Sequence, residues 1–138
     1  MIHKPIRHAP LIYFSGKSKV AKWVCKHLPT GGRPYVEPFC GAASILLYRE
    51  PAPVEVINDI DGDIVNLFRV LRDEELFPKL ERKLLLTPYA RAELELALSM
   101  ETEDPVERAW RTMVLYNFGT AGLRATSIGR WERAITYA

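Results

Sequence analysis

The chain has 138 residues, of which 48% are hydrophobic and 26% are charged. This composition is typical of one soluble globular domain and argues against intrinsic disorder. No apolar run approaches the roughly 18 residues of a membrane-spanning helix, and the N-terminus has no secretory h-region, so we expect a cytoplasmic protein without a membrane partner. Cys25 and Cys40 lack the paired spacing of a zinc site or a disulfide scaffold, which predicts two reduced thiols and no metal site.

The net charge of the chain is +2, but acidic and basic residues are unevenly distributed along it. Residues 1–36 contain seven Lys or Arg and no Asp or Glu, residues 37–107 contain sixteen acids against seven bases, and residues 108–138 contain five bases against one acid. Basic ends therefore flank an acidic middle. Such ends could meet DNA phosphates, whose neutralisation supplies much of the affinity of DNA-binding proteins. A lysine-rich, solvated helix face would give the same pattern.

The first part of the chain indicates two local units, each ending in a helix. An apolar run over 11–14 is followed by a tight turn, and residues 17–28 have helical character before Pro29. Strand-forming residues over 34–39 lie between glycine-containing turns, and a helix rich in small residues follows over 42–48. We therefore expect a strand, a glycine turn and a helix in the second unit.

The next segment repeats the strand and helix pattern. Residues 54–59 alternate as a strand, and the apolar side chains of 64–71 fall on one helix face, with Asp61 or Asp63 as the acid of the first turn. Two strand-helix units in series predict an α/β fold. Residues 35–72 would then form the start of a doubly wound parallel sheet.

The sequence predicts three further helices, over 74–86, 88–100 and 105–116. Thr87 and Asp104 are plausible caps for the second and third, because each stands before a proline at the first helical position. Pro78 interrupts the first of the three.

The turn after the first strand is the place to look for a ligand, because doubly wound sheets bind ligands outside the carboxyl ends of their strands. Gly41 lets the backbone approach a ligand there. Asp59 ends the second strand eighteen residues later, where a carboxylate can accept hydrogen bonds from two ribose hydroxyls. The spacing predicts an adenosine-containing ligand and leaves a dinucleotide and S-adenosylmethionine open. Alternatively, Gly41 only serves the turn and Asp59 caps the next helix.

Three blocks in series, over 13–19, 37–44 and 58–68, carry a resemblance to a known family. They resemble, in order and spacing, three motifs of the Dam-like adenine-specific DNA methyltransferases, which include many phage members. The motifs are an opening aromatic-x-Gly-Gly-Lys element, a cofactor-binding Pro-Phe-x-Gly-x-Gly-Ser loop, and an acidic motif with its helix. Ser15 and Ala43 replace one glycine each in the first two blocks.

The resemblance implies S-adenosylmethionine as cofactor and double-stranded DNA as substrate. It assigns six residues to the cofactor site: Tyr13 and Lys17 against the cofactor, Pro38, Phe39 and Gly41 as its floor, and Asp59 on the ribose hydroxyls. It further implies an incomplete Rossmann-like methyltransferase domain over 1–86 and, over 87–138, a helical start of the DNA-recognition region, truncated.

Residues 105–123 are similar to the helix and glycine-containing loop that lead into the family's recognition region. An amphipathic core helix with Trp110, Val114 and Leu115 buried explains the same apolar residues. Downstream, three arginines are candidates for phosphate contacts, and solvated surface positions are the alternative for them: Arg124, Arg130 and Arg133.

The family's catalytic Asp-Pro-Pro-Tyr element, which holds a flipped adenine, does not occur in the 138 residues. The only Asp-Pro pair is Asp104-Pro105, at the start of a predicted helix. We therefore assign no catalytic residue and expect a truncated chain, inactive alone and marginally stable, with room for a second polypeptide that supplies the catalytic half. The alternatives are a catalytically silent cofactor-binding or DNA-binding module and a non-functional prophage remnant.

Overall fold

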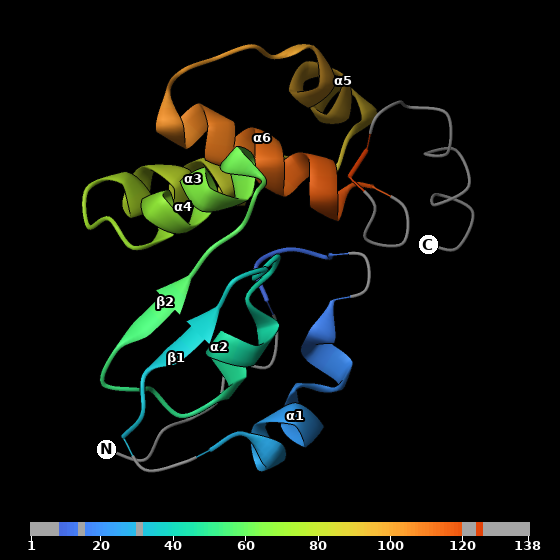
Figure 1. Cartoon of the computed structure of the whole chain (residues 1–138). Coiled ribbons are helices and arrows are strands. Elements are labelled where there is room, and N and C mark those ends of the chain that lie inside the picture. The colour runs from blue at the N-terminus through green and yellow to red at the C-terminus, as the bar shows by residue number, and fades with distance from the viewer. Residues whose placement is uncertain (1–8, 14–15, 30–31, 120–123, 126–138) are drawn as a thin grey trace.

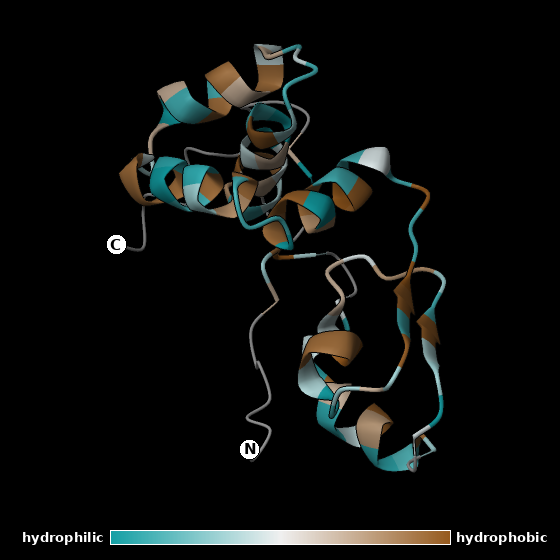
Figure 2. Ribbon diagram, turned by 90° about the vertical axis from the view of Figure 1, so that its left-hand side faces the viewer, coloured by the Kyte–Doolittle hydropathy of each residue, from teal (hydrophilic) through white to brown (hydrophobic). Residues whose placement is uncertain are grey.

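The strands and helices of the chain separate into two layers (Figure 1). The computed structural model describes residues 9–13, 16–29, 32–119 and 124–125. One layer holds a short 3-10 helix, two helices and two strands: η1 (Lys17–Lys19), α1 (Ala21–His27), β1 (Tyr35–Glu37), α2 (Ser44–Tyr48) and β2 (Glu55–Ile57). The other holds four helices: α3 (Gly62–Leu71), α4 (Leu76–Leu86), α5 (Arg91–Ser99) and α6 (Pro105–Asn117). Figure 2 shows the same separation after a 90° turn.

The two strands pair in parallel, as the sequence predicts. In their register Tyr35 lies opposite Glu55, Val36 opposite Val56, and Glu37 opposite Ile57. The helix α2 makes the connection between them, and α1 packs against α2. Both strands are shorter than predicted. Side chains of the central pair are about half exposed, at 57% for Val36 and 46% for Val56, so one face of the sheet is open.

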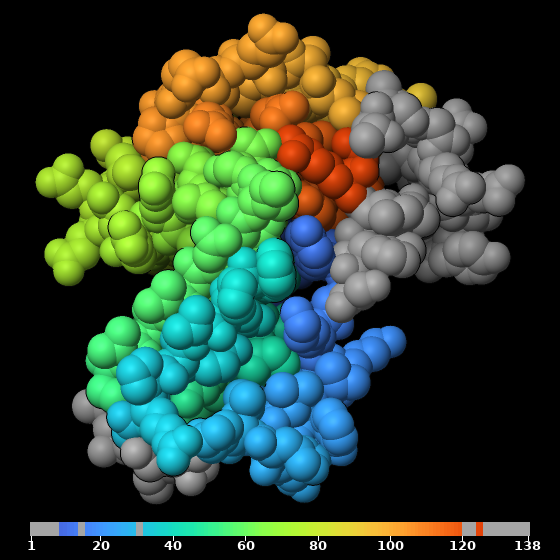
Figure 3. Space-filling model, viewed as in Figure 1, coloured from blue at the N-terminus to red at the C-terminus, as the bar shows by residue number. Residues whose placement is uncertain are grey.

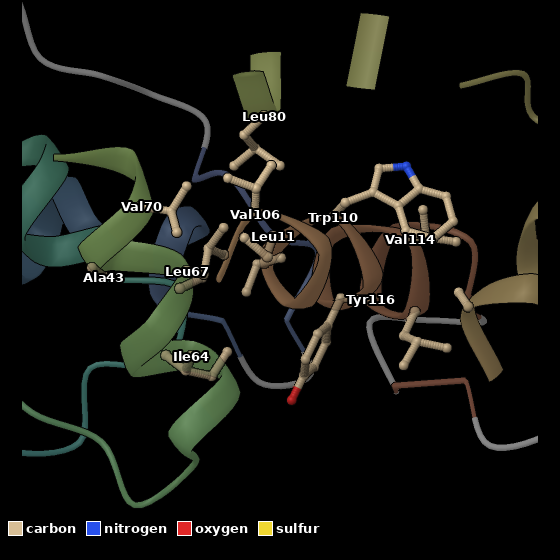
Figure 4. Packing of buried hydrophobic residues seen from close by; sticks show 14 of the residues in the cluster. Leu11, Ala43, Ile64, Leu67, Val70, Leu80, Val106, Trp110, Val114 and Tyr116 are labelled. Atoms are coloured by element: carbon tan, nitrogen blue, oxygen red, sulfur yellow. The ribbon is translucent and has the colours of Figure 1, made fainter. Parts of the chain in front are cut away.

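The helical layer is built around α6, which packs against α3, α4 and α5. Its buried side chains include Trp110, Val114 and Leu115, so the predicted core role of these residues is confirmed. Figure 4 shows buried side chains of α3, α4 and α6 in this core, among them Ile64, Leu67, Val70, Leu80, Val106 and Trp110. The contact between α4 and α6 crosses the predicted domain boundary at residue 86. None of the described helices combines the length and the apolar character needed to cross a membrane.

Of the two predicted helix caps, the structure confirms Asp104 and contradicts Thr87. Asp104 caps α6 as predicted, because its Oδ1 accepts from the backbone N–H of Glu107 at 2.9 Å and Pro105 opens the helix. The prediction for Thr87 was wrong, since α5 begins only at Arg91. The Thr87 hydroxyl instead donates to the carbonyl of Lys83 at 2.7 Å and accepts from the Trp110 indole N–H at 2.7 Å. A buried indole N–H needs an acceptor, and Thr87 supplies it.

Helix boundaries also depart from the prediction near the N-terminus. The single helix expected over 17–28 is divided at Val20 into η1 and α1. The helix expected from 42 begins at Ser44, because Ala43 has left-handed backbone angles, φ 51° and ψ 35°. Pro78 lies in the first turn of α4, where a missing N–H removes no helical hydrogen bond.

The turn after β1 uses left-handed backbone at Gly41 as well, with φ +49°. A methyl group at this position would lie 3.1 Å from Cε1 of Tyr13, closer than almost any real contact of this kind. Position 41 therefore demands glycine for two reasons, the backbone angle and the approach of the Tyr13 ring.

An ionic network joins α3 to α6 and to the segment beyond it. Asp63 accepts from Arg108 at 3.0 Å, from Arg111 at 3.3 Å and from Arg124 at 2.6 Å. Burial by itself would raise the pKa of the Asp63 carboxyl, but the hydrogen bonds and charges of Arg108 and Arg124 outweigh burial and lower the pKa. The carboxylate is therefore the charged centre of this contact.

Substituting Gly41→Ala should lower the free energy of unfolding by about 1–2 kcal/mol, the cost of a left-handed conformation for a residue with a Cβ atom. The matched control is Gly62→Ala in the first turn of α3, where an added methyl meets nothing within 4 Å. That change should be neutral or stabilising by roughly 0.5 kcal/mol. Urea unfolding of both variants measures the difference, and equal stabilities would contradict the constraint at position 41.

The Asp63 network should make stability depend on acid pH. The folded-state pKa is lowered, so the contribution is fully present above the unfolded pKa of about 3.9 and is lost as the pH falls through the folded pKa. Replacing Asp63 by Asn should reduce the free energy of unfolding at pH 7 by on the order of 2 kcal/mol, and the loss should shrink towards pH 3.

The control for this prediction is Asp73→Asn. Asp73 accepts from the backbone N–H groups of Glu75 and Leu76, and an asparagine can accept there too. Urea unfolding curves at pH 3, 5 and 7 should therefore show little change for Asp73→Asn. An Asp63→Asn variant as stable as the parent chain at pH 7 would show that the network adds nothing to folding.

Candidate functional site

A pocket of about 270 Å³ lies where the carboxyl ends of the two strands meet the N-terminal segment. Its lining is Tyr13, Gly16, Lys17, Phe39, Cys40, Gly41, Ala42, Ser44 and Asp59. Five of the six predicted cofactor residues are among them, and only Pro38 is not. In Figure 3 the blue N-terminal segment, the cyan turn after β1 and the green segment after β2 meet beneath the helical layer.

Asp59 connects the two turns that form the pocket. Its Oδ2 accepts from the backbone N–H of Gly41 at 2.8 Å, and its Oδ1 accepts from that of Asp61 at 3.0 Å. The alternative in which Asp59 caps the next helix is wrong, because Asp61 caps α3 by accepting from the N–H of Asp63 at 2.9 Å. A carboxylate has about four lone-pair sites, so each oxygen of Asp59 can still accept from a ligand hydroxyl.

Backbone hydrogen bonds extend the strand pairing up to this point. The Asn58 N–H donates to the carbonyl of Glu37 at 3.0 Å, and the Cys40 N–H donates to the carbonyl of Asn58 at 2.9 Å. Pro38 contributes through its carbonyl oxygen, which accepts from the Asn58 side-chain amide at 3.1 Å. Pro38 therefore holds the two strand ends together and does not line the pocket.

Tyr13 is held over the turn by a second tyrosine from the helical layer. The rings of Tyr13 and Tyr116 stack with their centroids 5.2 Å apart and their planes 23° apart. The Tyr116 hydroxyl donates to Oδ2 of Asp61 at 3.3 Å. Burial, together with Tyr13 and Asp61, raises the pKa of Tyr116, so its hydroxyl stays a donor at neutral pH. Tyr116 is a site residue that the sequence does not predict, because its position depends on packing between distant segments.

Lys17 and Cys40 both line the pocket, but Lys17 is half exposed and Cys40 is buried. The Lys17 Nζ lies 4.0 Å from Oε1 of the buried Glu37 while half of its side chain is exposed, so the ammonium can also meet a ligand. Burial first, and then the charges of Asp59 and Glu37, raise the pKa of the Cys40 thiol to about 11. Cys40 is therefore neutral at pH 7 and is not a nucleophile.

A second pocket, of about 580 Å³, adjoins the first through Cys40 and Asp59, which line both. Its other lining residues belong to α2, β2 and α3 or directly follow β2 and α3. They are Leu46, Glu55, Ile57, Asn58, Val65, Phe68, Arg69 and Arg72. A ligand held by Asp59 thus has space on both sides of the carboxylate.

The predicted DNA-contacting arginines are only partly described by the structure. Arg124 is paired with Asp63 at 2.6 Å and with Asp61 at 3.7 Å. Its guanidinium is therefore occupied within the protein, and contact with DNA stays a prediction for it. Arg130, Arg133 and the substituted position Ser15 lie outside the described residues.

Comparison with known protein families identifies a match over most of the chain. No curated protein matches the chain. The family model described as D12 class N6 adenine-specific DNA methyltransferase matches residues 13–127, which is most of the sequence. This match spans all three motif blocks, the two pocket-forming turns and the four helices of the second layer, and it confirms the family that the motifs predict. The chain belongs to the D12 class N6 adenine-specific DNA methyltransferase family.

Proposed function

We propose that the chain binds S-adenosylmethionine in the pocket at Asp59, as the cofactor-binding part of an adenine-specific DNA methyltransferase. The family uses this methyl donor, which carries a ribose with two hydroxyls and an amino-acid end with a carboxylate. The observation that carries the proposal is the Asp59 carboxylate, fixed by Gly41 and Asp61 between two adjoining pockets. A fixed acceptor at this position suits the ribose.

The other lining residues fit the remaining parts of such a ligand. The Lys17 ammonium is placed to pair with the carboxylate of the amino-acid end. Gly41 leaves room for close approach of the ligand to the backbone. Phe39 is 78% exposed and offers an apolar surface that a ligand would cover. The pocket of about 580 Å³ is within the size range common for small-molecule sites, roughly 300–1,000 Å³, and the adjoining pocket of about 270 Å³ is slightly smaller.

The proposed architecture is an incomplete Rossmann-like methyltransferase domain over 1–86, followed by the start of a DNA-recognition region over 87–138. The parallel pair β1 and β2, with α2 between them, supports the first part. A small parallel sheet with helices is compatible with part of a methyltransferase fold.

Methyl transfer by this chain alone is not part of the proposal. Adenine's amino group is a poor nucleophile, and the family's Asp-Pro-Pro-Tyr element, which counters this, has no counterpart in the sequence. We propose that transfer to adenine in double-stranded DNA requires a catalytic element that these 138 residues do not contain. A catalytically silent cofactor-binding module is the alternative. It predicts that the chain binds S-adenosylmethionine but that no methyl group is transferred even when the catalytic element is supplied.

Calorimetric titration with S-adenosylmethionine tests the binding site. Lys17→Gln should weaken binding about tenfold or more, because a charge-assisted hydrogen bond contributes roughly 1.5–3 kcal/mol. Lys19→Gln is the matched control, since Lys19 belongs to the same 3-10 helix but does not line the pocket. Equal affinities of the two variants would contradict the assigned role of Lys17.

Asp59→Asn should weaken binding by at least as much, because the amide loses the charge that strengthens hydrogen bonds from the ribose hydroxyls. Asparagine can still accept from the Gly41 N–H, so this variant separates ligand binding from folding better than alanine does. Thermal unfolding of the same sample verifies that it is folded. A folded Asp59→Asn chain with unchanged affinity would refute the ribose assignment.

A methylation assay tests the catalytic half of the proposal. The purified chain, given S-adenosylmethionine and unmethylated duplex DNA, should transfer no methyl group above background. Transfer to adenine by the chain alone would show that residues of this sequence replace the missing element.

A further inference from the structure

We propose that an exposed surface of η1 and α1, formed by Lys19, Lys22, Trp23 and Lys26 and here called the α1 basic face, binds the phosphate backbone of duplex DNA that flanks the target. The inference rests on the proposed function, because it takes DNA as the substrate. It adds a binding surface outside the cofactor pocket and upstream of the recognition region.

The charge of this surface is not neutralised within the described part of the protein. Residues 17–27 contain four lysines and no acid. Lys19, Lys22 and Lys26 are exposed and form no ion pair with any described residue. Lys22 and Lys26 are four residues apart in α1, so they project from the same side of the helix. Adjacent like charges of this kind destabilise a helix, and a polyanion relieves the repulsion.

An aromatic side chain lies within the same surface. Trp23 is 65% exposed although it belongs to a helix, and its ring contacts His27 with the centroids 4.5 Å apart. Only Ala21 of α1 is buried, so Trp23 adds nothing to the core. Tryptophan is enriched at binding surfaces, where it supplies a large contact area.

The surface begins at the edge of the cofactor pocket. Lys17, the first residue of η1, lines that pocket, and α1 packs on α2, the helix that follows the cofactor turn. DNA that brings an adenine to the pocket must place its neighbouring phosphates close to the pocket edge. The lysines that continue from Lys17 are thus positioned to neutralise them.

Several other cations of the described structure lie close to acidic residues. Arg108, Arg111 and Arg124 are occupied by Asp63. Exposed bases of α4, such as Lys79 and Arg82, share their helix or its start with Glu75 and Glu81 and lie in the other layer (Figure 1). The α1 basic face is therefore the better match for a polyanion.

The experiment measures the dissociation constant for a fluorescent duplex at several salt concentrations, using the full chain with S-adenosylmethionine. Each phosphate contact contributes about 0.9 to the slope of log K against log salt. A Lys22→Gln/Lys26→Gln variant should flatten the slope by about 1.8, the sum for two contacts. The control, Lys79→Gln/Arg82→Gln, removes the same charge from α4 and should leave the slope unchanged.

Three results would overturn the inference. An unchanged slope in the α1 variant, or an equal decrease in both variants, excludes specific phosphate contacts at the α1 basic face while the proposed function stands. Absence of DNA binding by the parent chain removes both the surface and the DNA partner, and cofactor binding is then judged separately by calorimetry.

Tryptophan fluorescence gives a second measurement that does not depend on the lysine variants. Trp23 is exposed and Trp110 is buried, so Trp23 should dominate the acrylamide quenching from these two residues. Trp131 is the third tryptophan of the chain, so the measurement uses a Trp131→Phe background. Saturating duplex DNA should reduce the quenching in this background, and adding Trp23→Phe should abolish that reduction. A reduction that persists in Trp23→Phe would place the DNA elsewhere.

Discussion

The pocket depends on one hydrogen bond, from the backbone N–H of Gly41 to the carboxylate of Asp59 at 2.8 Å. The two residues lie in the turns that follow neighbouring parallel strands, and each strand contributes only three residues to the sheet. So short a pairing fixes the direction of a strand but does not position the turn beyond it. The Asp59 carboxylate does this, because its second oxygen accepts from Asp61 and links the turn to the start of α3. The group best placed to bind a ribose thus also builds the site.

The same small set of contacts joins the two layers. Tyr13 stacks on Tyr116 of α6, whose hydroxyl reaches Asp61, the cap of α3. Asp61 in turn lies 3.7 Å from Arg124, beyond the end of α6. A chain of contacts therefore runs from the pocket at Asp59 to the segment after α6. Removal of one tyrosine would leave a gap under the other, so the pocket and the helical layer are expected to unfold together.

Local patterns in the sequence were enough to find the pocket, because its residues belong to two short turns with characteristic spacing. Parallel strands then bring the two turns to the same edge of the sheet, where the hydrogen bond from Gly41 to Asp59 fixes them. Thr87 and Tyr116 illustrate what such patterns miss. A threonine before a proline has the appearance of a cap, but the buried indole of Trp110, 23 residues away, uses its hydroxyl. Tyr116 meets Tyr13 only when α6 packs beside the pocket.

Ala43 shows how a departure from the family's motif can be tolerated. The motif has glycine here, and the chain keeps the left-handed backbone, with φ 51°, despite the added methyl group. The conformation costs roughly 1–2 kcal/mol for a residue with a Cβ atom. The methyl is completely buried in the core, which returns about 0.8 kcal/mol. Burial therefore offsets part of the conformational cost, and the loop keeps the left-handed backbone at position 43. The side chain of Ala43 does not line the pocket, and the substitution therefore acts on stability more than on ligand binding.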